Sequence, residues 1–318
     1  MSSEIAQSSE IAQSSDITPP DAHPSITLET VVSLVAEQTP DFVHLGIGER
    51  FDGWDCAMFR LGDDFAARLP RTQEAVRFLR AETHWVPQLS SGWDFPAPRF
   101  VAHGLPGHGF PWPWVVVTWV PGEMADAFPL SADAGAALGR ALAQVHTPSP
   151  DDAPFNVEQS IPMANRDVKV RERVAAVASA PGPRGEALDV AAALAIWDDA
   201  LAAREHAEWV WSHADLHGAN VLSHEGAFGG IVDWGSMAMC DPAVDLGFTH
   251  TLMPRAGVDA AFAEYGRLTG RVDPDFVARA RGIALSKCVG VALSPRQVSS
   301  AMGWRGLVAL GVALGVAA

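Results

Sequence analysis

The stretch that decides the fold is Trp211-Ser212-His213-Ala214-Asp215-Leu216-His217-Gly218-Ala219-Asn220, followed after ten residues by Ile231-Val232-Asp233-Trp234-Gly235. Apolar runs at 209–211 and 231–232 lead directly into these polar residues, as buried strands do where they end at a site. Asp215, Asn220 and Asp233 offer one proton acceptor and two oxygen ligands for a hard cation such as Mg²⁺. These are the residues that phosphoryl transfer to a hydroxyl group requires.

The order and spacing of these residues resemble the motifs of the aminoglycoside and macrolide phosphotransferase family, small-molecule kinases with a protein-kinase-like fold. Residues 213–222 and 231–235 carry the resemblance, and Asp241-Pro242-Ala243-Val244-Asp245-Leu246 completes it. Ala214 and Cys240 stand where the family has Gly. If the backbone at 214 needs a positive φ, an Ala there is strained.

The resemblance implies roles for five residues of these motifs. Asp215 is expected to be the catalytic base, and Asn220 and Asp233 are expected to bind Mg²⁺. His213 and Asp245 are expected to be structural residues near the site, where Asp245 would accept hydrogen bonds from backbone amides of the catalytic loop. His217 has no expected role beyond being their neighbour.

The implied fold is α+β and bilobal, with a small antiparallel β-sheet in the N-terminal lobe and a larger, mainly helical C-terminal lobe. Residues 1–24 are expected to be a disordered tail, because 2–17 repeat Ser-Ser-Glu-Ile-Ala-Gln almost perfectly and are too polar to order themselves. Residues 25–118 would then form the nucleotide-binding lobe, and 119–318 the catalytic and substrate-binding lobe.

In the N-terminal lobe, apolar spacing predicts a helix within 25–38, three antiparallel strands within 42–69 and a helix at 71–86. The loop 48–55, with Gly48 and Gly53, would cover the phosphates of a nucleotide, although a plain hairpin turn explains it equally well.

The resemblance also assigns residues to the nucleotide. Arg68 stands where the fold has a Lys that holds the α- and β-phosphates. Its helix partner is expected to be Glu82, with Glu74 as the less favoured choice. After a Pro-rich linker at 87–113, the strand at 114–120 would pass to the second lobe. Its Thr118 C=O and Val120 N–H would then bind the base of ATP or GTP, unless the segment is an ordinary edge strand.

The second lobe is predicted to be mostly helical, with a helix at 131–146 and helices within 156–208 that break at 180–183. Acidic residues of this region would face a cationic substrate or simply be solvated; they are Glu186, Asp189, Asp198 and Asp199. The apolar segment 306–318 has thirteen residues, fewer than the roughly twenty that span a bilayer, and is predicted to be a helix packed on the lobe.

Charge and cysteine content restrict the partners and the compartment. A formal net charge of −16 disfavours nucleic acid and anionic membranes as partners, because both attract Lys and Arg. The same charge is compatible with a small-molecule hydroxyl substrate that is cationic. Three cysteines, an odd number without metal-like spacing, favour a cytoplasmic protein without disulfides.

The most favoured function is therefore Mg²⁺-dependent transfer of a γ-phosphate to a hydroxyl group of an aminoglycoside or macrolide antibiotic. A metabolic kinase for choline, homoserine or a sugar would share the site. Two other classes stay open. A metal-dependent hydrolase could use His213, Asp215 and His217, which stand at strand spacing. A catalytically silent kinase-like binding protein is suggested by Ala214 and Arg68.

Overall fold

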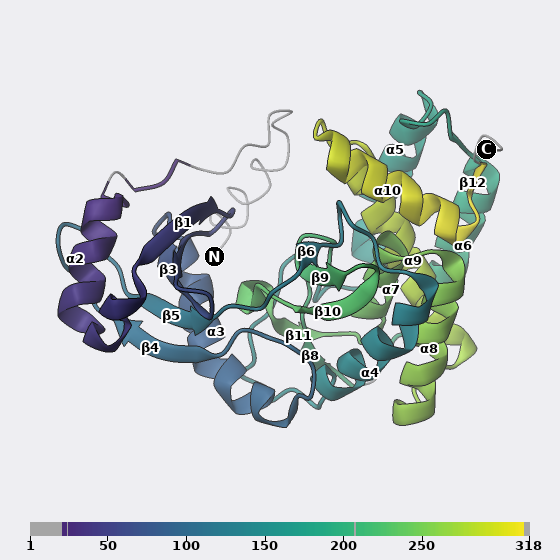
Figure 1. Ribbon diagram of the computed structural model, residues 1–318. Helices are drawn as coiled ribbons and strands as arrows, with labels where there is room; N and C mark the ends of the chain where they lie inside the picture. The colour runs from purple at the N-terminus through teal and green to yellow at the C-terminus, as the bar shows by residue number, and fades with distance from the viewer. Residues whose placement is uncertain (1–20, 24, 207, 315–318) are drawn as a thin grey trace, which may run out of the picture.

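The protein, described here by a computed structural model for residues 21–23, 25–206 and 208–314, has two lobes (Figure 1). Most of the predicted tail, 1–20 and 24, lies outside the described residues. Residues 21–23, which the tail prediction included, lie against the first lobe: the His23 N–H donates to the Arg71 carbonyl at 3.0 Å, and its ring packs edge-on against Trp112. These residues therefore belong with the lobe.

The N-terminal lobe is one antiparallel sheet with the strand order β1-β2-β3-β5-β4. One helix packs on each face of this sheet. Its elements are α2 (Leu28–Gln38), β1 (Ile47–Asp52), β2 (Cys56–Leu61), β3 (Phe65–Pro70), α3 (Ala75–Leu89), β4 (Phe100–Gly104) and β5 (Trp114–Thr118). Helix α2 begins where the Thr27 side chain accepts a hydrogen bond from the Thr30 N–H. The three strands predicted within 42–69 are confirmed.

Two sequence predictions for this lobe were wrong in detail. The segment Pro40–Leu45 forms a 3₁₀ helix, because Pro40 and Asp41 favour a helical first turn, so the first strand begins only at Ile47. Residues 100–104 form strand β4, although the sequence pattern placed them in a Pro-rich linker. Because β4 covers one side of β5, strand β5 lies inside the sheet and is not an edge strand.

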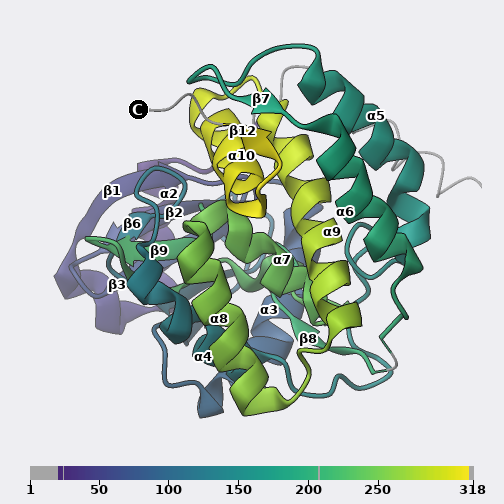
Figure 2. The same ribbon diagram turned by 90° about the vertical axis from the view of Figure 1, so that its right-hand side faces the viewer.

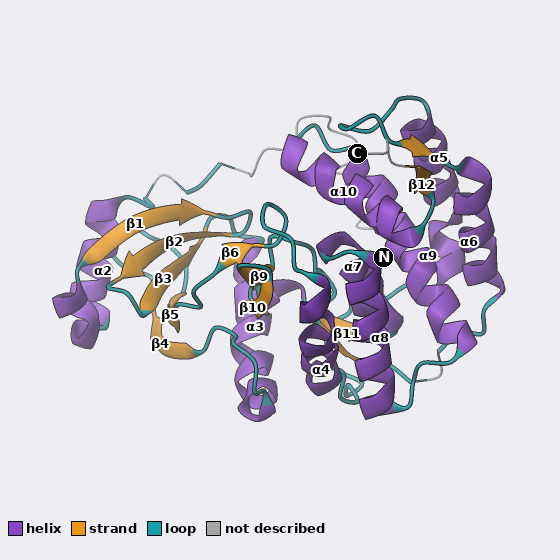
Figure 3. Cartoon of the chain, turned by 45° about the vertical axis from the view of Figure 1, so that its right-hand side comes forward, coloured by secondary structure: helices purple, strands orange, loops and turns teal. Residues whose placement is uncertain are grey.

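The C-terminal lobe is mainly helical. Figure 3 shows the larger sheet with α2 and α3 at one end of the molecule and most of the other helices at the opposite end. Its helices are α4 (Gly135–Val145), α5 (Asp167–Ala178), α6 (Val190–Ala202), α7 (Ala243–Leu252), α8 (Arg255–Thr269), α9 (Pro274–Ala292) and α10 (Gln297–Leu310). Figure 2 shows α5, α6, α9 and α10 gathered on the side away from the sheet. The α+β bilobal prediction is confirmed.

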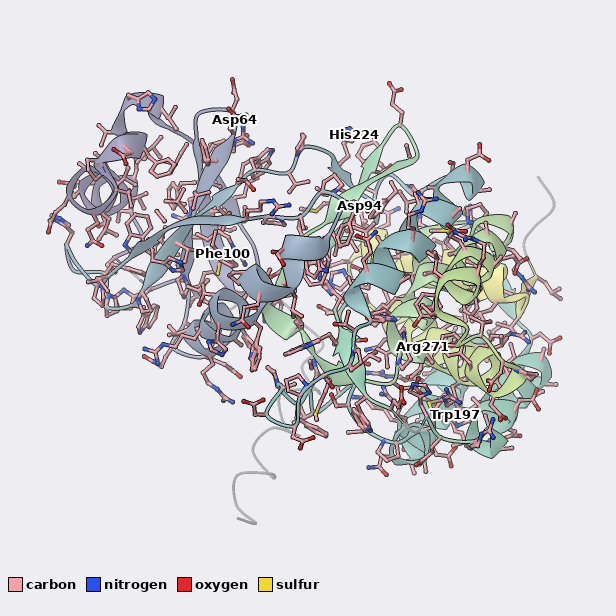
Figure 4. The ribbon with its side chains drawn as sticks, turned by 90° about the horizontal axis from the view of Figure 1, so that it is seen from below. Asp64, Asp94, Phe100, Trp197, His224 and Arg271 are labelled. Atoms are coloured by element: carbon pink, nitrogen blue, oxygen red, sulfur yellow. The ribbon has the colours of Figure 1, made fainter. Side chains whose placement is uncertain are left out.

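Short strands after residue 122 position the motif residues, which follow β8, precede β9 and follow β10. They are β6 (Glu123–Met124), β8 (Val210–Ser212), β9 (Val221–His224), β10 (Ala227–Ile231) and β11 (Ala238–Cys240). Strand β9 pairs with both β6 and β10, and β8 pairs with β11. In Figure 4, Asp64 and Phe100 mark the first lobe, Trp197 and Arg271 the second, and His224 the β9–β10 hairpin.

The end of the described chain departs from the prediction of one helix through 306–318. Helix α10 stops at Leu310, because Gly311 adopts a left-handed conformation (φ 79°) that ends it. Strand β12 (Ala313–Leu314) then pairs with β7 (Ala187–Leu188). Among the described residues, none of the helices combines the length and the apolar character that crossing a membrane requires.

The three cysteines, Cys56, Cys240 and Cys288, are free and buried. Burial raises the pKa of each thiol to about 12, because a thiolate loses its hydration inside the protein.

Helices α4 and α8 approach so closely that glycine is required between them. A Cβ at Gly139 would lie 2.3 Å from the Ala261 carbonyl oxygen, and one at Gly135 would lie 2.0 Å from the Gly257 oxygen. The obstacle is backbone, which moves only if the helices separate.

We expect Gly139→Ala to lower the free energy of unfolding by about 1–2 kcal/mol, because overpacking outweighs the gain of about 1 kcal/mol in helix propensity. Urea denaturation measures this change. Gly92→Ala is the matched control, since nothing lies within 4 Å of its added Cβ. Equal stability of the two variants would contradict the close contact.

Candidate active site

The predicted base, Asp215, follows strand β8 through a sharp turn. Ala214 in this turn has a φ of 64°, a left-handed conformation that costs an L-residue roughly 1–2 kcal/mol. The prediction that an Ala at this position is strained if φ is positive therefore applies. Asp215 itself is half-exposed, at 41% for its side chain. The turn thus directs this carboxylate out of the fold.

The strained turn is held by Asp245 of helix α7, which is fully buried. Its Oδ2 accepts the His213 N–H at 2.7 Å and its Oδ1 accepts the Ala214 N–H at 3.0 Å. His146 of α4 lies on the other side, with its Nε2 3.1 Å from Asp245 Oδ2. Burial alone would raise the pKa of Asp245, but the hydrogen bond with His146, its neighbouring charges and the amide donors lower it.

His213 is also fully buried and uses both ring nitrogens within the loop. Its Nδ1 accepts the Asp215 N–H at 3.3 Å, so Nε2 carries the proton that it donates to the Val232 carbonyl at 3.0 Å. The ring packs edge-on against Trp234. With both nitrogens engaged, His213 has none to offer a metal ion, which weighs against the metal hydrolase.

Asn220 lies beside Asp215. Its Nδ2 donates to the Asp215 carbonyl at 2.8 Å and lies 3.4 Å from Asp215 Oδ2. The Val232 N–H donates to the Asn220 carbonyl at 2.9 Å, so Asp233 follows directly in the neighbouring segment. Asp233 has a φ of 60°, which ends strand β10 and turns the chain into the 3₁₀ segment Trp234–Ser236. The structure thus brings all three motif residues together.

The donor set of this cluster suits Mg²⁺. Because the Asn220 amide nitrogen is engaged by Asp215, its amide oxygen is the atom left to coordinate a cation, beside the half-exposed Asp233 carboxylate. Within the described ranges, no group of three or more His, Cys, Asp or Glu side chains is arranged to hold a metal ion. Two protein oxygens nevertheless fit Mg²⁺, which usually completes its octahedron with waters and substrate phosphates.

His217 contacts the predicted base directly, with its Nε2 3.4 Å from Asp215 Oδ2. Burial disfavours the imidazolium, but the hydrogen bond to Asp215 and the charges of Asp215, Asp233 and Asp126 raise the pKa of His217. In turn, burial works against ionisation of Asp215, whereas the bond with His217 and the charges of His217, Lys287 and His213 lower its pKa. Asp215 is therefore a carboxylate at neutral pH.

Arg68 of strand β3 joins the motif to the first lobe. Its Nη1 donates to Glu82 Oε1 of helix α3 at 2.8 Å, and its Nη2 donates to Asp233 Oδ1 at 3.4 Å. Burial disfavours the charge of Arg68, but the Glu82 carboxylate raises its pKa above the ordinary value. Glu74, the less favoured partner, is exposed and immediately precedes α3.

The pair Arg68–Glu82 retains unused polar atoms. Arg68 Nε and Glu82 Oε2 are buried and have no hydrogen-bond partner among the described residues. A buried donor without a hydrogen bond costs about 1–3 kcal/mol. The free Nε of the guanidinium therefore fits a ligand with anionic oxygens, such as a phosphate chain.

Of the two predicted loop glycines, only Gly53 lies at the β1–β2 turn, where its N–H donates to the Cys56 carbonyl at 3.0 Å. Gly48 lies within strand β1, beside Arg60, and so the structure does not bring it to this turn. The turn also carries Asp55, to which sequence reasoning gave no role. Burial and the charge of Asp233 raise the pKa of Asp55 to about 6.

Thr118 and Val120 lie at the passage between the lobes. Thr118 ends β5, and its N–H donates to the Arg99 carbonyl at 2.9 Å. Val120 faces the other lobe, since a Cβ at Gly230 would lie 3.1 Å from Val120 Cγ1. Both therefore lie between the sheet of the first lobe and the β9–β10 hairpin.

The four acidic residues expected to meet a cationic substrate are engaged elsewhere or lie apart from Asp215. Glu186 is buried against Arg184, Asp189 caps helix α6, and Asp198 pairs with Arg171 at 2.6 Å. Asp199 lines a shallow depression between α6 and α9. Their observed partners favour the alternative in which these four residues serve the fold or are solvated.

A side chain that sequence reasoning missed is Lys287 of α9, whose charge acts on Asp215. A signal was present: the chain has only two lysines, and this one interrupts the otherwise mostly apolar run 283–289.

Comparisons with known proteins agree with this geometry. A model of the phosphotransferase enzyme family matches residues 49–280. No curated protein matches the chain. The GDP complex of wild-type aminoglycoside 2'-phosphotransferase-IIIa is similar, with 17% identity and a TM-score of 0.60, over 88% of this chain and 96% of that one.

Two macrolide enzymes are also similar. Macrolide 2'-phosphotransferase MphH from Brachybacterium faecium has 21% identity and a TM-score of 0.55, over 89% of this chain and 93% of that one. Macrolide 2'-phosphotransferase type I has 17% identity and a TM-score of 0.54, over 87% and 96%. At such identities the likeness establishes the shared fold.

The buried carboxylate of Asp245 leads to a pH-dependent prediction. Its lowered pKa means that it stabilises the fold above its unfolded pKa of about 3.9 and loses this effect as the pH falls below that value. We expect Asp245→Asn to lower the free energy of unfolding by about 1.5–3 kcal/mol at pH 7, since one N–H then faces an amide NH₂. Urea denaturation at pH 7 and pH 3 measures the difference in the free energy of unfolding between the wild type and Asp245→Asn. This difference should be smaller at pH 3.

Asp259→Asn is the matched control for this variant. Asp259 makes an exposed i,i+4 pair with Arg255 on α8, and such pairs contribute about 0.3–0.5 kcal/mol. A deficit of Asp245→Asn that is the same at both pH values would show that its carboxylate charge does not hold the turn.

Proposed function

The chain belongs to the phosphotransferase enzyme family, and on this premise we propose that it transfers the terminal phosphate of a nucleoside triphosphate to a hydroxyl group of a small molecule. The observation that carries the proposal is the meeting of Asp215, Asn220 and Asp233 at one point, with the Arg68–Glu82 pair beyond Asp233. This arrangement supplies a base, two metal ligands and a phosphate clamp.

In the proposed reaction, Asp215 orients the acceptor hydroxyl and takes its proton as the oxygen attacks the γ-phosphorus. The bond between the γ-phosphorus and the β–γ bridging oxygen breaks, and the nucleoside diphosphate leaves. Asp215 suits this role because it is ionised, partly exposed and fixed by a rigid turn. Asn220 and Asp233 would hold Mg²⁺, which, when bound, neutralises charge on the phosphate oxygens. Catalysis would then rest on positioning and on electrostatic stabilisation.

The nucleotide would lie between the lobes. The guanidinium of Arg68, fixed by Glu82, would hold the α- and β-phosphates through the edge that bears the unpartnered Nε. Thr118 C=O and Val120 N–H would bind the base, and the turn at Gly53 would cover the phosphates. Both ATP and GTP are proposed donors, since backbone groups recognise the base here. We propose that the boundary between the lobes follows Thr118. We also propose that the protein acts in the cytoplasm.

The acceptor is the least constrained component. The similar structures are of enzymes named for aminoglycosides and macrolides, so hydroxyl groups of these antibiotics are the first acceptors to test.

The roles of the two aspartates make a direct prediction. We expect Asp215→Ala to lower kcat by about 10²–10⁴-fold, because a positioned base contributes that much. We expect Asp233→Ala to lower kcat by several orders of magnitude, because charge on the phosphates is then not neutralised. His217→Ala should have a small effect. Radiolabelled phosphate transfer from Mg²⁺·ATP and Mg²⁺·GTP to an aminoglycoside and macrolide panel measures all three.

Near-normal rates in either aspartate variant would reject these assignments. Failure of the wild type to bind or turn over either nucleotide would reject the proposed function itself.

A further inference from the structure

Three basic side chains lie together on the C-terminal lobe beside the catalytic loop: Lys287 of α9, Arg173 of α5 and Arg166, which precedes α5. We call them the cation cluster. Lys287 and Gly290 are neighbours on one face of α9, since residues three apart face the same way. A Cβ at Gly290 would lie 2.9 Å from Arg173 Nη1, so the Arg173 guanidinium rests on this glycine next to Lys287.

Helix α7 contacts both the cation cluster and the turn that presents Asp215. Lys287 Nζ lies over the ring of Phe248, 4.9 Å from its centroid. Phe248 stands three residues after Asp245 on α7, and Asp245 holds the backbone of the turn that presents Asp215. The charge of Lys287 accordingly acts on Asp215. The ammonium group therefore lies close enough to the base for its positive charge to favour the ionised carboxylate of Asp215.

In the part of the chain that the structure describes, the cations of the cluster have no ion-pair partner. Among the described residues, no carboxylate oxygen lies within 4 Å of Lys287, Arg173 or Arg166. Arg166 is buried and donates to Gln159, through Nη1 at 3.4 Å and through Nη2 at 2.9 Å. Its buried Nε has no hydrogen-bond partner within the described ranges. Lys287 contacts an aromatic ring in place of an acid.

Such an arrangement is costly without a ligand, because burying a charge is unfavourable unless an opposite charge compensates for it. Burial lowers the pKa of Lys287 to about 8 and lowers the pKa of both arginines. The carboxylates that oppose this effect most for Lys287 are Asp215 and Glu158. Glu158 is exposed, and Asp215 is needed for the acceptor hydroxyl.

We infer that the cation cluster binds an oxyanion of the acceptor, so that the substrate is an alcohol carrying a carboxylate, sulfate or phosphate group at the end remote from the reacting hydroxyl. This inference rests on the proposed function. The oxyanion supplies the charge that the cluster lacks, and its two or three oxygens suit forked guanidinium donors. Binding at this point also positions the hydroxyl against Asp215.

The cluster disfavours a polycationic acceptor for the same reason. An ammonium group of an aminoglycoside placed beside Lys287 and Arg173 would meet like charges in a partly desolvated place, which costs affinity. The net charge of −16 suggested the opposite preference, but local charges at the site decide which ligand binds there.

The first test uses sulfate as a compact dianion probe on the full chain. The phosphate site is first saturated with Mg²⁺ and a non-hydrolysable ATP or GTP analogue, and thermal unfolding is compared in sodium sulfate and sodium chloride of equal ionic strength. We expect sulfate to raise Tm further in the wild type and to lose this effect in Lys287→Met and Arg173→Gln. Without sulfate, Lys287→Met should unfold at an equal or higher temperature, because an uncompensated charge is removed.

Lys169→Met is the matched control, since Lys169 is the other lysine of the chain and lies exposed on α5. It should keep the full response to sulfate. The absence of a sulfate effect in the wild type, or an equal effect in Lys287→Met, would overturn the inference. If the nucleotide analogues themselves do not raise Tm, the proposed function fails instead, and the two failures are thereby distinguished.

The second test measures phosphate transfer to paired acceptors: hydroxy acids and their methyl esters, sugar phosphates and free sugars, and kanamycin. We expect phosphate transfer to the anionic member of each pair that the site accepts. Whether the hydroxy acid or the sugar phosphate is the better acceptor then shows whether the cluster binds a carboxylate or a phosphate ester. Lys287→Met should raise the KM of that acceptor at least tenfold while the KM of the nucleotide stays within twofold. Preference for kanamycin or for neutral members, or a rise in nucleotide KM alone, would overturn the inference.

Discussion

The whole site depends on one buried carboxylate, that of Asp245. It holds two consecutive backbone N–H groups of a turn whose left-handed residue is Ala214, a conformation that an L-residue adopts only when its surroundings impose it. Because His146 contacts the same carboxylate, helix α4 is joined to the turn as well. The direction of Asp215, and through it the position of Asn220, follows from this anchoring.

The features that the sequence allowed us to predict are those whose residues lie close together in the chain. Asn220 and Asp233 flank the β9–β10 hairpin, and Asp215 stands five residues before Asn220, so their spacing indicates that they meet. The pair Arg68–Glu82 was also foreseeable, because a strand and the helix that follows it pack directly. The contact of Arg68 with Asp233, 165 residues away, was not predicted, since spacing carries no signal over such a distance.

The remaining features arise from packing between distant elements. Strand β4 was missed because prolines surround it, although pairing with β5 satisfies its backbone. The cation cluster joins Arg173 and Lys287, which stand 114 residues apart in the chain on different helices, and the Arg173 guanidinium rests on Gly290. The role of Asp198 was left open between a cationic substrate and solvent, because its partner, Arg171, could not be identified from charge alone.

The burial of all three thiols has a practical consequence. Since a thiolate is the reactive form and the pKa of each cysteine is raised to about 12, the folded chain presents almost no nucleophilic sulfur near neutral pH. A cysteine introduced on the surface of either lobe would therefore take up a maleimide fluorophore or spin label selectively. The distance between the lobes can then be followed during nucleotide binding without first replacing Cys56, Cys240 or Cys288.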